Sequence, residues 1–199
     1  MKKLLISILS LTIYSSLAGQ ELRFSVAPTS NVFHKSYDGD ETYDSQARGI
    51  SASIDYLHFV KNKLGLGIGL GFQQNKTNNI SLTMPTEYFL STEKINLLTI
   101  SLKSKYNISR LFYFSLDPLI DFHLNYDPLQ VTDNQSGLGF STGIGGNFKL
   151  KNRLYFNVEP RLWMHNLVPF HNIDTPFRLS AVGINLGLML DQNKTEKNN

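Results

Sequence analysis

The chain has 199 residues, of which 41% are apolar and 18% charged, and it contains no cysteine. This length suits a single domain, and the missing cysteine excludes disulfide scaffolds, thiol catalysis, cysteine-ligated metals and a lipoprotein anchor. The net charge of +3 is too small to indicate nucleic-acid binding. Because the basic residues form no continuous stripe in the sequence, we expect no nucleic-acid partner.

The first 19 residues have the pattern of a secretory signal peptide. Lys2 and Lys3 precede the apolar run 4–14, and small residues follow that run. A run of this length is shorter than the ~20 residues that a transmembrane helix needs, so the pattern is typical of a cleaved export signal. We therefore expect a signal peptide over residues 1–19 with cleavage at about 18–20, a barrel domain over 20–190 and a polar tail over 191–199.

Apolar and polar residues alternate through most of the remaining chain. Because side chains point to opposite faces of a strand in turn, this period of two predicts β-structure. The connections alternate between short and long, which is typical of an up-and-down barrel with tight turns at one rim and large loops at the other. The expected strands cover residues 21–28, 48–60, 64–73, 94–106, 111–124, 137–150, 153–165 and 177–190.

Each expected strand has one apolar face and one polar face, and glycine is frequent on the polar one; in 64–72, for example, Leu, Ile and Phe alternate with glycine. An eight-stranded barrel has a lumen only wide enough for its own side chains, so an inward face of Leu and Phe would crowd it. Glycine on a solvent-facing strand would have no packing reason. We therefore predict an all-β, eight-stranded antiparallel transmembrane barrel with its apolar face toward lipid.

Aromatic residues gather at both ends of the expected strands, where the membrane interfaces of such a barrel would fall. They are Phe59, Tyr106, Phe112, Phe148 and Phe156 beside the short turns, and Phe72, Phe89, Phe122, Tyr126 and Trp163 near the long loops.

The export signal, the eight alternating strands, the basic tight turns and the long polar loops resemble the small outer-membrane β-barrels of Gram-negative bacteria, the OmpA/OmpX-like group, over residues 21–190. The resemblance implies an outer-membrane location, short periplasmic turns and long extracellular loops. It also implies contact with outer-membrane lipid and lipopolysaccharide, and insertion by the barrel insertion machinery. Barrels of this group usually end on an aromatic residue, whereas this last strand ends at Leu190 and a polar tail follows.

The polar face, placed inward, would carry charges of both signs into the lumen. Buried charges persist only when they are paired and hydrogen-bonded, so we expect a salt-bridged network that fills the lumen. The alternative is a charge pair that switches partners and gates a narrow path. The expected network consists of Arg23, Asp55, Lys103, Lys105, Asp117, Asp121, Lys149, Glu159 and Arg161.

A short internal repeat is the most specific local signal. Tyr-Phe-Ser-Leu-Asp-Pro at 113–118 recurs as Tyr-Phe-Asn-Val-Glu-Pro at 155–160, and a histidine follows each copy, at His123 and His165. Because proline lacks the N–H donor of a strand ladder, the two prolines predict a bulge or kink in each strand. We expect both histidines to lie in the lumen or at its rim, and metal binding or acid–base chemistry is the alternative.

The first long loop carries an acidic cluster whose oxygen ligands would suit calcium. Its residue order lacks the Asp-x-Asp-x-Asp-Gly pattern of a calcium loop, so we expect a solvated loop and no metal. The cluster consists of Asp38, Asp40, Glu41 and Asp44.

Catalytic motifs of lipid-modifying barrels are incomplete in this sequence. Lipid A deacylase-like barrels carry a His-x-Ser pair, but neither His165 nor His171 has a serine two positions later. Palmitoyl-transfer barrels use an Asp-Ser pair, and Asp44-Ser45 lacks further support. We therefore expect a non-enzymatic, cofactor-free monomer whose long loops bind an unidentified surface ligand or support the envelope. A narrow solute channel, a lipid A-modifying hydrolase or acyltransferase, and a soluble periplasmic lipocalin-like carrier are the alternatives.

Overall fold

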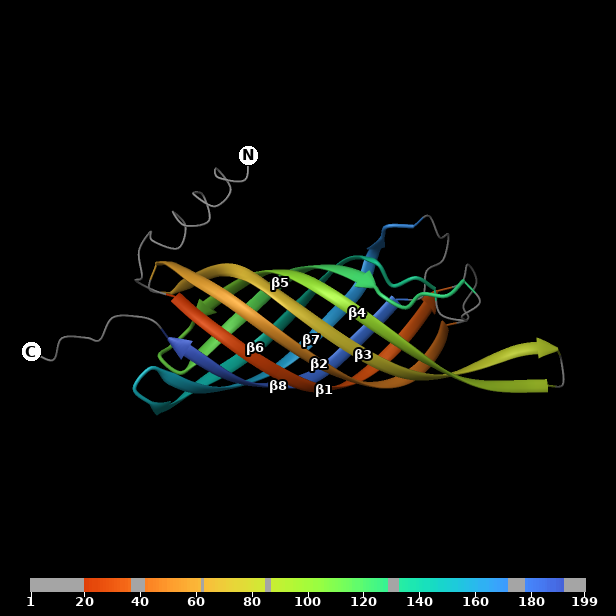
Figure 1. Ribbon diagram of the computed structural model, residues 1–199, viewed down its shortest axis with the longest axis horizontal. Helices are drawn as coiled ribbons and strands as arrows, with labels where there is room; N and C mark the ends of the chain where they lie inside the picture. Colours follow the sequence, from red (N-terminus) through yellow and green to blue (C-terminus); the bar gives the residue numbers. More distant parts are fainter. Residues whose placement is uncertain are drawn as a thin grey trace, which may run out of the picture.

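The computed structural model is a closed barrel of eight antiparallel strands, in which each strand pairs with its sequence neighbours and β1 pairs with β8 (Figure 1). It describes residues 20–36, 42–61, 63–84, 87–128, 133–171 and 178–191. In those residues, no helix is long and apolar enough to cross a membrane. The strands are β1 (Gln20–Ser36), β2 (Thr42–Lys61), β3 (Leu64–Met84), β4 (Glu87–Asn107), β5 (Phe112–His123), β6 (Gly137–Lys151), β7 (Leu154–Pro169) and β8 (Arg178–Asp191).

The structure describes only part of the two segments that were predicted at the ends of the chain, the signal peptide and the polar tail. The expected signal peptide, residues 1–19, and tail residues 192–199 lie outside the described residues, as do Asp38, Asp40 and Glu41. The start of β1 and the end of β8 lie at the same end of the barrel, beside the short turns (Figure 1).

Two of the expected long loops are instead continued hairpins. β1 and β2 pair as far as Ser36 and Thr42, and β3 and β4 pair as far as Met84 and Glu87. Asp44, expected in the first loop, therefore lies in β2. These segments lack a regular apolar alternation, because both faces of a strand that leaves the barrel can be polar. Their pairing with a neighbouring strand makes them strands.

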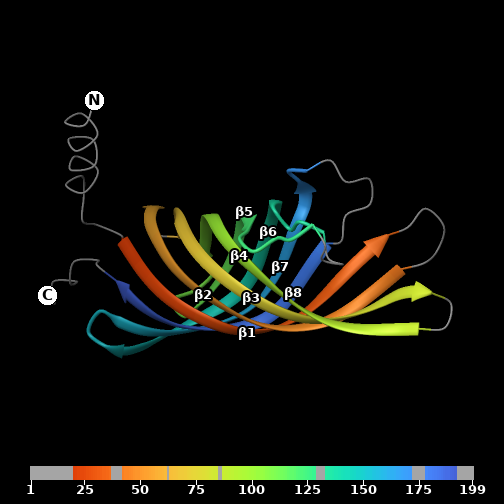
Figure 2. The same ribbon diagram turned by 45° about the vertical axis from the view of Figure 1, so that its right-hand side comes forward.

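The β3–β4 hairpin extends beyond the barrel wall. β2 pairs with β3 no farther than Thr77, and β5 pairs with β4 only from Leu97. Beyond those points each strand pairs only with its hairpin partner. Figures 1 and 2 show the resulting two-stranded ribbon at the long-loop end.

The outer face of the barrel is apolar and the inner face is largely polar, as predicted from the alternation. The outward-facing Ile68 and Ile144 are each 61% exposed, whereas the inward-facing Asp117 and Glu159 are completely buried. A soluble protein would bury such aliphatic residues and would not expose so large an apolar surface. The outer wall is therefore suited to lipid.

Glycines on β6 allow side chains from β5 and β7 to meet in the lumen. β6 lies between these two strands in the sheet. A Cβ at Gly145 would collide with the ring of Tyr113 on β5, and a Cβ at Gly143 would lie 2.8 Å from a carboxylate oxygen of Glu159 on β7. β6 therefore contributes space rather than side chains at this depth.

The prolines of the sequence repeat interrupt two ladders without shifting their register. The β4–β5 pairing stops at Leu119 and resumes at Ser115, on either side of Pro118, with the same register on both sides. Pro160 interrupts the β6–β7 pairing in the same way. The predicted bulge at these prolines is therefore wrong, because a missing N–H donor removes one bond without adding a residue to the strand.

Candidate functional site

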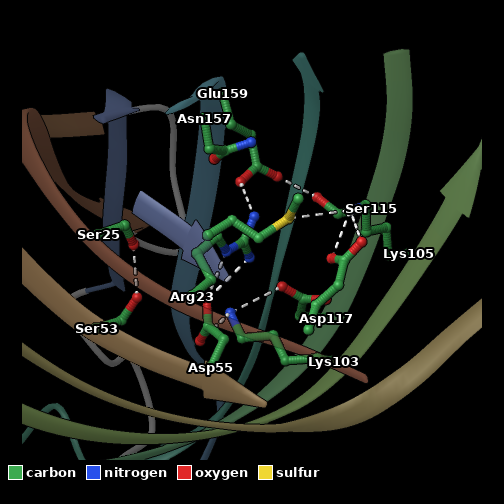
Figure 3. A network of polar contacts seen from close by, with 12 residues as sticks. Arg23, Ser25, Ser53, Asp55, Lys103, Lys105, Ser115, Asp117, Asn157 and Glu159 are labelled. Carbon is green, nitrogen blue, oxygen red and sulfur yellow. Dashed lines mark hydrogen bonds and ion pairs between the residues drawn. The ribbon is translucent and has the colours of Figure 1, made fainter. Parts of the chain in front are cut away.

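A closed ring of charged side chains crosses the lumen, and we call it the charge ring. Three cations and three anions alternate around it, and each neighbouring pair is joined by an N–O contact of 2.7 to 3.2 Å. Figure 3 shows Arg23 between Asp55 and Glu159, and Lys103 beside Asp117. In order, the ring runs Arg23, Asp55, Lys103, Asp117, Arg161, Glu159 and back to Arg23.

The charge ring ties together strands from around the barrel. Its members belong to β1, β2, β4, β5 and β7. Each member has two neighbours of opposite charge, so the formal charges of the ring sum to zero. A buried charge without a partner would be strongly unfavourable, and this arrangement leaves none of the six uncompensated.

Neutral side chains add further hydrogen bonds to the charge ring. The hydroxyl of Ser115 donates to Glu159 Oε1 at 2.5 Å and accepts from Arg161 Nη2 at 3.0 Å. The hydroxyl oxygen of Tyr113 accepts from Arg23 Nη1 at 3.0 Å and from the side-chain amide of Asn157 at 2.8 Å. Hydrogen bonds to charged groups are stronger than neutral ones, so these contacts hold the ring geometry.

The two copies of the sequence repeat meet across β6. Residues on β5 and β7 that are 44 positions apart are hydrogen-bonded at four levels, although equivalent residues of the two copies are 42 positions apart. Because β5 and β7 run in the same direction on either side of β6, a constant spacing in the sequence repeats the contact at successive levels. The contacts are Tyr113 with Asn157, Ser115 with Glu159, Asp117 with Arg161, and Asp121 with His165.

Toward the short turns, a separate ion pair lies beside the charge ring. Lys105 Nζ lies 2.7 Å from Glu21 Oε2, and it also lies 4.5 Å from the ring centroid of Tyr113 and 5.6 Å from that of Phe59. Glu21 is absent from the predicted network, although it shares the inward parity of Arg23. Phe59 was expected at the membrane interface, and its contact with Lys105 places it inside instead.

Lys149 does not belong to the buried network, so that prediction is wrong. It has the same parity as the buried Asn147, but it lies next to the short turn and is exposed. The strand continues past the depth at which the lumen closes. Parity therefore assigns a face of the sheet but not a depth along it.

Toward the long loops, Asp121 and His165 form a buried pair. His165 Nδ1 lies 2.8 Å from Asp121 Oδ2, and the hydroxyl of Thr99 donates to the other carboxylate oxygen at 2.6 Å. The β6–β7 register shifts beside His165, where Asn166 has a φ of 52°. A bulge of this kind changes the direction of neighbouring side chains.

His123 has a different environment from His165, although both follow a copy of the repeat. Its backbone N–H donates to the hydroxyl of Ser136 at 2.9 Å, and its ring centroid lies 5.6 Å from that of Tyr126. Within the described ranges, no three His, Cys, Asp or Glu side chains are grouped as a metal site would require.

A cavity of about 30 Å³ lies beside the charge ring on its long-loop side. Lys103, Arg161, His165 and Gly71 contribute to its wall. This volume holds about two water molecules, so it is too small for an organic solute.

Two clusters of apolar side chains lie toward the long-loop end of the lumen, among buried polar residues such as Asn31 and Asn75. The largest buried cluster there is formed by Phe33, Ala47, Ile95, Leu97 and Leu179. A second cluster joins Trp163 to Leu119 and two alanines, and Trp163 is only 7% exposed. The prediction that Trp163 lies at the outer membrane interface is therefore wrong.

A family model for the outer membrane protein β-barrel domain matches residues 4–189. The chain belongs to this family. Its apolar outer wall accordingly lies in the outer membrane, and the predicted family, fold class and location are confirmed. The alternative of a soluble periplasmic carrier is wrong.

Solved outer-membrane proteins have similar folds at low sequence identity. AlkL, determined in DMPC lipid bilayers, is 10% identical, with 92% of this chain and 94% of that chain covered and a TM-score of 0.51. OprG from Pseudomonas aeruginosa is 12% identical over 85% and 96% of the two chains, with a TM-score of 0.47. Ail from Yersinia pestis is 10% identical over 86% and 99%, with a TM-score of 0.43. No curated protein matches the sequence.

Proposed function

We propose that this outer-membrane barrel is a non-enzymatic, monomeric scaffold with a sealed lumen, and that it binds surface ligands through its long-loop end. The charge ring is the observation that supports a sealed lumen. It joins five of the eight strands through paired charges and leaves no member available to a passing ion. A closed barrel also has no free strand edge in its wall, which favours a monomer.

Two further layers support a sealed lumen. The Glu21–Lys105 pair blocks the short-turn side of the ring, and the apolar cluster around Phe33 and Leu97 fills the long-loop side. A hydrated ion would have to displace paired charges and then cross a packed apolar layer. Eight strands leave a lumen that side chains can fill, so no wide aqueous channel is expected.

The position of the Asp121–His165 pair argues against lipid hydrolysis or acyl transfer. A hydrolase would need a nucleophilic hydroxyl on the free imidazole nitrogen and access from the membrane. In the described part of the chain, His165 Nε2 has no hydrogen-bond partner, and the residue is only 1% exposed. A lipid acyl chain outside the barrel would have no route to this nitrogen.

The β3–β4 hairpin supports the surface-binding role. Beyond Thr77 and Leu97 it forms a two-stranded ribbon whose outer edges have no paired strand. Free strand edges and extended loops on a rigid scaffold are where binding usually resides. We therefore place ligand contact at this ribbon rather than inside the lumen.

Recording ionic current across planar lipid bilayers tests the sealed lumen. The wild-type protein should give no conductance steps, whereas the combined variant Arg23→Ala, Leu97→Ala, Lys105→Ala should give them, because it removes one side chain from each of the three layers. Lys149→Gln, an exposed site outside the ring, is the matched control and should stay silent. Steady conductance through the wild-type barrel would refute the proposal.

A second arm tests the surface role on intact bacteria. Residues 79–91 would be replaced by an Asn-Gly turn, which closes a two-residue hairpin. The shortened protein should still fold as a barrel, but attachment of expressing cells to one another and to a host-cell monolayer should fall to that of cells lacking the protein. Unchanged attachment would place any binding elsewhere.

A further inference from the structure

Three cations form one cross-strand row on the outer wall of the barrel. Arg48 on β2 pairs with Lys76 on β3, and Lys76 pairs with Lys94 on β4. All three side chains are exposed on the outward face. Neighbouring strands are about 4.8 Å apart, so three like charges occupy about 10 Å of the sheet. Like charges directly opposite one another destabilise a sheet, and a bound anion would remove that cost.

The outward positions around this basic row carry no carboxylate among the described residues. The next outward position on β2 is Ile50, and those on β3 and β4 are Gln74 and Asn96, whose side-chain amides are hydrogen-bonded at 3.0 Å. In the described segments, no ion pair joins a carboxylate to any of the three cations. Among the side chains that the structure describes, the row is therefore a positive site without a paired carboxylate.

The basic row lies just beyond the lipid-facing band. Phe72 on β3 and Phe122 on β5 belong to one cross-strand row through Leu98, and aromatic girdles mark the membrane interface of such barrels. Lys76 is two outward positions beyond Phe72, about 13 Å along the strand. The cations are thus at the level of lipid headgroups, on the long-loop side.

We propose that Arg48, Lys76 and Lys94 bind the phosphate groups of lipopolysaccharide in the outer leaflet. A lipid with phosphates on its headgroup and acyl chains below would meet the cations at the rim and the apolar wall beneath them. Guanidinium binds phosphate through paired hydrogen bonds, and ammonium groups act as point charges. The proposal rests on the outer-membrane location and is independent of whether the lumen is sealed.

Binding of purified full-length protein to lipid A, the phosphorylated anchor of lipopolysaccharide, tests this site in detergent solution. The triple variant Arg48→Gln, Lys76→Gln, Lys94→Gln is compared with the wild type. A basic residue beside an anionic lipid contributes about fivefold in affinity, so the triple variant should bind about 10- to 100-fold more weakly. It should also lose most of the salt dependence of binding.

The matched control removes the same charges from the opposite rim. Lys63, Lys151 and Arg153 are exposed beside the short turns, and their triple change to Gln should leave lipid A affinity within about twofold of the wild type. The heat-dependent shift of a folded barrel on detergent gels shows that each variant is folded. If the first triple variant does not fold, Lys76→Gln alone should weaken binding about fivefold.

Dephosphorylated lipid A, with its acyl chains intact, separates phosphate recognition from apolar adhesion. The wild type should bind it as weakly as the triple variant binds lipid A. Equal binding of the two lipids, an unchanged affinity in the basic-row variant, or an equal loss in the short-turn control would each overturn the proposal. The bilayer conductance of the basic-row variant should match the wild type, because the row is outside the lumen.

Discussion

The two halves of the lumen exclude water in different ways. Toward the short turns, the lumen is filled by charged side chains that are paired with one another, and the charge ring is the main layer. Toward the long loops, apolar packing of Phe33, Ile95, Leu97 and Leu179 predominates, and the Asp121–His165 pair is buried in this half as well. Either solution satisfies the requirement that a buried group be paired or apolar. The polarity of an inward-facing position therefore depends on its depth.

Two neighbouring glycines on β3 lie on either side of the boundary between these halves. A Cβ at Gly69 would collide with Asp55, Lys103 and Ser101, whereas the nearest atoms to a Cβ at Gly71 are 3.7 Å away. Gly69 lies under the charge ring, and Gly71 lines the cavity. The paired half is thus tightly packed, and the small free volume is located just above it.

Breaking the charge ring should have the largest effect. Asp117→Ala removes a shared partner of Lys103 and Arg161 and should lower the free energy of unfolding by about 3–5 kcal/mol. Urea unfolding in lipid vesicles, followed by the fluorescence of the single tryptophan, Trp163, would measure it. Lys149→Gln, outside the ring, should change the value by less than about 0.5 kcal/mol. If Asp117→Ala lowered the free energy of unfolding as little as Lys149→Gln does, the charges of the ring would not be stabilising one another.

Removing buried apolar atoms from the long-loop half should have a smaller effect on the free energy of unfolding, and this effect should not depend on salt. Leu97→Ala deletes buried methyl groups and should cost about 2–4 kcal/mol in the same unfolding assay. Because no charge is involved, the loss should be the same at low and high salt. A strong salt dependence would show that this half is not held by packing alone.

Substituting alanine for Gly69 or for Gly71 should have the smallest effects on the free energy of unfolding, and the two effects should differ. Gly69→Ala overpacks the charge ring and should lower the free energy of unfolding by about 1–3 kcal/mol. Gly71→Ala places its methyl group in the cavity wall and should change stability by less than about 0.5 kcal/mol. Equal losses from the two variants would contradict the difference in packing between the halves.

All six members of the charge ring belong to the set expected from strand parity. Period-two alternation is a local property, so a residue such as Asp117 or Arg161 can be assigned to the inner face without knowledge of its neighbours. Glycine on the same face indicates in advance that lumen side chains need space. The repeat at 113–118 and 155–160 did not predict which side chains meet, because its copies are offset by 42 residues and the hydrogen-bonded residues are 44 positions apart.

Depth and register explain what the sequence pattern did not predict. Lys149 and Phe59 have inward parity, but only the strand pairing shows that the first lies beyond the closed lumen and the second lies against Lys105. The basic row is a clearer case. Arg48, Lys76 and Lys94 are far apart in the sequence, and the pairing of three strands brings them side by side.

The amino-acid sequence by itself determined the class of fold, the lipid-facing residues and the charged composition of the lumen, because alternation along a strand is set by local geometry. The tertiary structure alone decided which charges meet, where the lumen closes and where cations gather on the outer wall. Those features depend on the register between strands that are distant in the sequence. A shift of one strand by two residues would keep every parity and change every partner.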